Sequence, residues 1–137
     1  MPLLPRAAAA CLIGGALALP AHAYDLQYRQ NGTSFSAPQL RELFNASLPA
    51  DYDRRFPERR WTTYLLLDAH ASKGLAAITL GLSPRVGESQ ALLPVATFSV
   101  IEPLPRSPGQ WQQLLGDVVS QYGTRMLDNS GRILNRR

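Results

Sequence analysis

The sequence predicts one α+β domain, an antiparallel sheet of about four strands with two amphipathic helices packed on one face (β-α-β-β-β-α). Three apolar runs at 61–70, 75–82 and 95–102 are rich in Val, Ile, Thr and aromatic residues and are bounded by turn residues, as strands typically are. Two other segments, 36–48 and 107–122, repeat their apolar residues at helical spacing behind a capping signal. Many unrelated small domains share this arrangement, so the fold alone predicts no activity.

A first strand is expected at 24–30, where Tyr and Leu residues alternate with polar ones. This alternation indicates a half-buried strand, which we place at an edge of the sheet. The dipeptide Asn31-Gly32 ends the strand, because it readily adopts the positive φ of a tight turn.

The first helix is expected at 36–48. Ser36 and Gln39 form a capping box, in which each side chain bonds the backbone N–H of the other residue. Pro49 stops the helix. Its apolar face comprises Leu40, Leu43 and Phe44.

The hairpin that joins the first two central strands turns at 71–74 and has two possible registers. If Ala71 pairs with Gly74 across a two-residue turn, the leucines of the first strand share a face with the apolar residues of the second, and Asp68 points to the opposite side. A three-residue loop with Gly74 at positive φ shifts the register by one and turns Asp68 towards the core. An unpaired buried carboxylate is costly, so we favour the first register.

The segment 83–94 is predicted to be a loop whose apolar residues 91–93 tuck against the domain. In the following strand, Phe98 and Val100 are expected to face inward.

The last helix is expected at 107–122. Ser107 caps it, Pro108 occupies the first helical position, and Gly123 suits a left-handed helix end. The tail 124–137 is expected to be partly ordered, with a turn at 128–131 and an edge strand at 132–135. The buried stripe of the helix comprises Trp111, Leu114, Leu115, Val118, Val119 and Tyr122.

The N-terminus has the three parts of a secretory signal peptide: one positive charge within 1–6, an apolar run at 7–19 and an A-x-A cleavage site at 21–23. Cleavage after Ala23 would leave 137 − 23 = 114 residues as a single domain, 24–137. Cys11 lies inside the apolar run and not at its end, so we assign it to the removed peptide and not to a lipid attachment site. The apolar run is too short to span a bilayer.

The expected exported chain contains no cysteine and one histidine, His70. An exported domain without disulfides suits a bacterial periplasm. Removing Arg6 leaves 13 basic and 10 acidic side chains, a net charge of +3 that neither requires nor excludes an acidic partner. These counts exclude a thiolate nucleophile and a zinc site with several Cys or His ligands. No phosphate-binding or dinucleotide fingerprint occurs, and we expect no metal and no cofactor.

One group of residues has the chemistry of a catalytic site. Asp68 and His70 are two positions apart on a strand, so their side chains share a face and the carboxylate can orient the imidazole. Glu102 is expected at the same end of the sheet, and the three could converge as an acid–base group or a weak metal site. Strand ends beside turns are also polar simply because they are solvated, and we prefer that interpretation.

The segment 49–60 (PADYDRRFPERR) is the most polar interior stretch, and two prolines make it a surface connection. Arginine beside aromatic residues is the composition of binding hot spots and also suits anionic ligands such as phosphate or lipopolysaccharide. The acids between the arginines argue against a pure polyanion site and allow the alternative of a solvated loop with its own ion pairs. The candidate binding residues are Arg54, Arg55, Phe56, Arg59, Arg60 and Trp61.

The function expected from the sequence is that of a small non-catalytic exported protein that binds a macromolecular partner in the periplasm. An inhibitor, an immunity protein or an envelope-assembly accessory would fit, and the partner is expected to be another envelope or secreted protein or an anionic envelope component, not nucleic acid. The first alternative is a small hydrolase or lyase that uses Asp68, His70 and Glu102. The second is a carrier for a small apolar or anionic ligand between helix and sheet.

Overall fold

The computed structural model of the chain describes residues 24–85 and 94–135. The predicted signal peptide 1–23 and the expected packing of 91–93 lie outside these residues. The elements are β1 (Asp25–Asn31), α2 (Ala37–Ser47), α3 (Tyr52–Arg55), β2 (Trp61–His70), the 3-10 turn η1 (Ala71–Lys73), β3 (Leu75–Pro84), β4 (Ala96–Pro103), α4 (Pro108–Asp128) and α5 (Ser130–Leu134).

The four strands form one sheet in the order β1-β2-β3-β4, which confirms the predicted α+β class. The pairs β2–β3 and β3–β4 are antiparallel, but β1 pairs with β2 in parallel, so the sheet is mixed and not entirely antiparallel. The reason is the connection through α2 and α3, which carries the chain back to the end of the sheet where β1 began.

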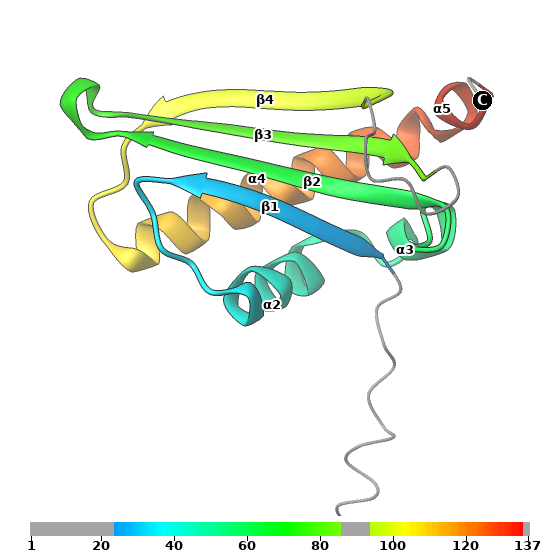
Figure 1. Cartoon of the computed structure of the whole chain (residues 1–137), viewed down its shortest axis with the longest axis horizontal. Coiled ribbons are helices and arrows are strands. Elements are labelled where there is room, and N and C mark those ends of the chain that lie inside the picture. The colour runs from blue at the N-terminus through cyan, green and yellow to red at the C-terminus, as the bar shows by residue number, and fades with distance from the viewer. Residues whose placement is uncertain (1–23, 86–93, 136–137) are drawn as a thin grey trace, which may run out of the picture.

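The helices form a second layer on one face of the sheet, where α4 runs beneath β3 and β4 and α2 packs beside it (Figure 1). The core lies between the two layers, with Leu65, Ile78 and Leu80 at 0 % exposure against α4 residues such as Leu115 and Val119. In the part of the chain that the structure describes, no helix has the length and hydrophobicity needed to cross a membrane.

The hairpin has the favoured register, because His70 pairs with Leu75 and Ala71 therefore stands opposite Gly74. Asp68 pairs with Ala77 on the face that the helices leave open. Gly74 adopts φ 64, the left-handed conformation that closes the 3-10 turn.

Both predicted helix starts are correct, and the Ser36–Gln39 capping box is present. The predicted end of the last helix at Gly123 is wrong, since α4 continues to Asp128. The predicted edge strand at 132–135 is also wrong: the segment 130–134 forms the helix α5, which buries Ile133 against the core.

Candidate functional site

The connection 49–60 is more structured than a surface loop. Tyr52 and Phe56 are spaced one helical turn apart, and the short helix α3 between them turns both rings into the core. The Phe56 ring packs on Tyr52 (5.2 Å between centroids) and on Trp61 (5.5 Å). Phe56 and Trp61 are 0 % and 2 % exposed, so the aromatic half of the predicted binding surface is used for packing and leaves no ring open to a partner.

The four arginines of the same connection are exposed. Arg54 forms a salt bridge with Asp51 in the preceding turn. Arg55 donates to the Ser130 Oγ at 2.7 Å, which ties α3 to the start of α5 at the same end of the sheet (Figure 1). Two of the four arginines are therefore already engaged by the fold.

Arg59 and Arg60 differ from these two. Among the described residues, neither side chain forms a hydrogen bond or an ion pair. The backbone beneath them is nevertheless fixed, because the Arg60 N–H donates to the Pro57 carbonyl (3.0 Å) and the Arg60 carbonyl accepts from the Arg85 N–H (2.8 Å). The structure thus presents the exposed side chains of two consecutive arginines on an ordered turn.

Arg85 extends this cationic surface from the end of β3. Its Nη1 donates to the Glu58 carbonyl at 2.8 Å and lies 3.6 Å from the Asp25 carboxylate. We call the five residues Arg54, Arg55, Arg59, Arg60 and Arg85 the basic end of the domain.

A groove of about 260 Å³ lies between β4 and the helices α4 and α5, beside the basic end. The guanidinium of Arg125 lies 5.0 Å from the centre of the Phe98 ring, and Arg132 and Asn129 complete the polar wall. We call it the β4 groove. Sequence reasoning missed it because Arg125 and Arg132 fall in a segment that was expected to be a tail.

Asp68 and His70 meet on the open face of the sheet, as their spacing predicts. The His70 Nε2 lies 3.2 Å from the Asp68 Oδ2, and the Asn31 side chain donates to the other Asp68 oxygen at 3.3 Å. Glu102 does not join them. It pairs with Ala76, which pairs with Ala69, so it belongs to the opposite face of the sheet. The expected convergence of three side chains is reduced to a pair.

Three tyrosine hydroxyls lie in or near the core. The Tyr52 hydroxyl is 2.6 Å from that of Tyr122 and 2.7 Å from the Thr63 hydroxyl, and the Tyr24 hydroxyl donates to Asn45. Burial raises the pKa of Tyr24 to about 12 and raises the pKa of both Tyr52 and Tyr122 above the ordinary value. These phenols are therefore neutral near pH 7 and serve packing. Nothing in the sequence pattern indicated that they meet.

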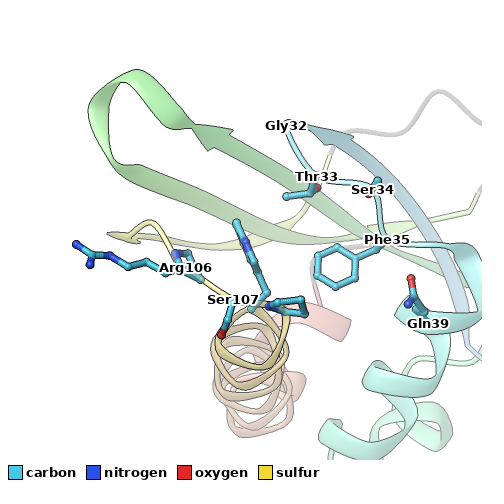
Figure 2. Close-up of a pocket in the computed structure, with 10 residues that line it drawn as sticks. Gly32, Thr33, Ser34, Phe35, Gln39, Arg106 and Ser107 are labelled. Carbon is cyan, nitrogen blue, oxygen red and sulfur yellow. The ribbon is translucent and has the colours of Figure 1, made fainter.

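A cleft of about 370 Å³ opens at the other end of the domain, between the β1–α2 loop and the start of α4. Figure 2 shows the Phe35 ring pointing into it, with Thr33 and Ser34 above and Gln39 at one side, while the Arg106 side chain extends away. The Phe35 and Trp111 rings meet edge to face at 6.2 Å. The two capping motifs indicated both helix starts, but not that the sheet brings them together.

Among residues 24–85 and 94–135, no three His, Cys, Asp or Glu side chains are grouped so that they could hold a metal ion. Comparison of the chain with protein-family models, with curated proteins and with solved structures gives no significant match.

Proposed function

We propose that the protein is a small, non-catalytic exported protein that binds a macromolecular partner in the periplasm through its basic end. The observation that carries the proposal is the pair Arg59–Arg60: two exposed cations with no side-chain partner among the described residues, on a backbone that hydrogen bonds hold in place. Cations that the fold does not use, on a backbone that is already ordered before binding, suit an acidic surface. The partner is another envelope or secreted protein, or an anionic envelope component.

Export is proposed from the charged, apolar and A-x-A parts of residues 1–23 and from the lack of cysteine in 24–137. The burial of Tyr24, 2 % exposed, supports a cleavage point no later than Ala23, because cleavage beyond Tyr24 would remove a core side chain.

A non-catalytic role is favoured by the state of the Asp68–His70 pair. The side chains are 42 % and 46 % exposed, and Glu102 belongs to the other face. A solvated pair that Glu102 does not join has little means of orienting a substrate. The hydrolase or lyase alternative therefore has no specific observation in its favour.

The test is capture from a native envelope extract, followed by measurement of the affinity for the recovered partner. The double variant Arg59→Glu/Arg60→Glu should bind at least tenfold more weakly, about 1.4 kcal/mol, with an unchanged melting temperature. Arg55 is left intact because its reversal would break the bond to Ser130. The matched control is Arg29→Glu/Lys73→Glu, the same charge change at exposed residues outside the basic end. A control variant that loses the partner while the Arg59/Arg60 variant keeps it would place binding elsewhere.

A small-ligand carrier is a second candidate, favoured by the cleft beside Phe35 and Trp111, whose volume lies within the range of ligand sites. Titration with the apolar anion anilinonaphthalene sulfonate tests it. Saturable binding that Phe35→Ala abolishes would support the carrier, and binding insensitive to this change would contradict it.

A further inference from the structure

We propose that the protein forms a symmetric dimer in which β4 pairs antiparallel with β4 of a second copy, joining two four-stranded sheets into one of eight strands. This inference is independent of the proposed function. It rests on three features of β4: a backbone edge that no described strand covers, a run at 96–101 without charge, proline or glycine, and a charge pattern that complements itself.

The free edge follows from the position of β4 and from its ladder. Among the strands of residues 24–85 and 94–135, β4 is last in the sheet and pairs only with β3 (Figure 1). The Leu104 N–H donates to the Gly74 carbonyl at 2.9 Å, and hydrogen-bonded pairs alternate along an antiparallel ladder. Counting back from Leu104, residues 102, 100, 98 and 96 turn their backbone groups to β3. Thr97, Ser99 and Ile101 therefore turn theirs outward, to the side where the described chain provides no strand.

The position of Pro103 agrees with this assignment. Pro103 falls at an outward position, and a proline within an edge strand must lie where no ladder donor is needed. The six residues before Glu102, 96–101, contain no charge, proline or glycine. Edge strands that stay unpaired usually carry such protection, and β1 at the opposite edge carries Asp25 and Arg29. The run 96–101 therefore lacks the features that keep an edge strand unpaired, and the charge and the proline of β4 lie at its end.

We place the two-fold axis of the dimer at Ser99, the middle one of the three outward residues. The outward residues then face one another, with Ser99 opposite Ser99 of the second copy and Thr97 opposite Ile101. On the helix face, Phe98 stands opposite Val100. Ile101, which is 69 % exposed in the single chain, would gain a cross-strand neighbour on the open face. The contact is isologous, so it closes as a dimer and does not propagate into a fibre.

The charges select a second copy over other occupants. In this pairing, Glu102 of one copy stands opposite Ala96 of the other, and Ala96 lines the β4 groove with Arg125 and Arg132. Glu102 is exposed, and neither it nor Arg132 has a side-chain partner among the described residues. Because the pairing is symmetric, the Glu102 carboxylate of each copy lies on the side of Arg125 and Arg132 of the other copy. No like charges stand opposite each other in this pairing.

The test is sedimentation equilibrium at protein concentrations from about 1 to about 100 µM. The protein is expressed from its full-length coding sequence. The protein should dimerise in this range. Glu102→Arg and Arg132→Glu should each weaken the dimer at least tenfold, and the two changes in one chain should restore it. Asp117→Arg and Arg29→Glu are the matched controls and should leave the dimer intact.

Ser99→Pro removes an N–H that only an added strand needs, so the variant should be a folded monomer. If the proline variant fails to fold, the Glu102→Arg and Arg132→Glu variants, singly and combined, still test the dimer. A monomer at every concentration would overturn the proposal, as would a dimer that Glu102→Arg leaves unchanged or a double variant as weak as the single ones. Recovery of a monomer whose β4 edge is occupied by a segment of a different protein would overturn it as well.

Discussion

Gly123 of α4 lies directly against Pro49 in the link between α2 and α3. A Cβ atom at Gly123 would overlap the Pro49 ring and come within 3.0 Å of the Leu48 Cδ2. The glycine therefore allows α4 to approach the end of α2, and its backbone conformation is ordinary helix. The close approach lies where the two main helices of the layer pack against each other.

The first prediction is that Gly123→Ala destabilises the protein. Alanine favours a helix over glycine by about 1 kcal/mol, but overpacking against a proline ring costs about 1–3 kcal/mol, so we expect a net loss. Urea denaturation measures it. Gly109→Ala in the same helix is the control, because a Cβ atom added there would meet no neighbouring element within 4 Å, and it should be neutral or stabilising. Equal stability of the two variants would contradict the close contact.

Gly123 also illustrates what the sequence could not decide. A glycine near the end of an apolar stripe fits a helix terminus and a close helix contact equally well, and only the position of Pro49 distinguishes them. The hairpin register was predictable because the alternative would bury Asp68. The direction of β1 was not, since it depends on how α2 and α3 carry the chain back across the helix layer.

The same limit applies to the candidate site. The exposure of Arg59 and Arg60 follows from the polarity of the connection. The burial of Phe56 and Trp61 does not, because aromatic residues beside arginines occur both in binding surfaces and in cores. Glu102 was placed at the correct end of the sheet but on the wrong face for a site with Asp68, since its face depends on the register of β4 against β3.

The second prediction is that Leu115→Ala costs about 2–5 kcal/mol of unfolding free energy, as cavities in well-packed cores do. Leu115 is 0 % exposed and faces the sheet from the middle of α4. Leu66→Ala on the open face, where Leu66 is 48 % exposed, is the control and should cost about 1 kcal/mol or less. Similar denaturation midpoints for the two variants would mean that α4 does not pack as described.

The third prediction is a loss of stability in alkali. Burial raises the pKa of Tyr24 to about 12 and that of Tyr52 and Tyr122 above the ordinary value of 10.0. As the pH rises above about 10, the unfolded chain loses these protons before the folded one does, so stability is retained below that pH and falls above it. Thermal melts followed by circular dichroism should show the decline.

The control for the alkaline decline is a pair of phenylalanine variants. Tyr122→Phe removes one of the buried phenols and should make the decline shallower, whereas Tyr28→Phe, at a residue 38 % exposed, should leave it unchanged. Equal slopes for Tyr122→Phe and the unmodified protein would show that these phenols do not cause the decline.

The fourth prediction is that the exported protein begins at Tyr24. The Tyr24 ring lies under the Arg41 guanidinium, 5.5 Å from its carbon, and meets Tyr52 edge-on at 6.1 Å. Cleavage after Ala23 keeps these contacts, and the A-x-A motif ends at that residue. The intact mass of the protein isolated from the periplasm identifies its first residue. A mass that retains residues 1–23, or a lipid on Cys11, would contradict the prediction.

The last prediction separates binding from catalysis. His70→Ala should leave both the fold and the affinity for the captured partner unchanged, because the His70 side chain is 46 % exposed and lies outside the basic end. An exposed pair of this kind contributes about 1 kcal/mol or less, and Asp68 keeps its bond from Asn31 after the change. Denaturant midpoints, the partner affinity and the phenotype of a strain carrying the variant are the measurements. The informative comparison is with Arg59→Glu/Arg60→Glu, which should lose the partner and the phenotype together. If His70→Ala abolished the phenotype while the arginine variant retained it, the binding function would be wrong and chemistry at Asp68 and His70 would replace it.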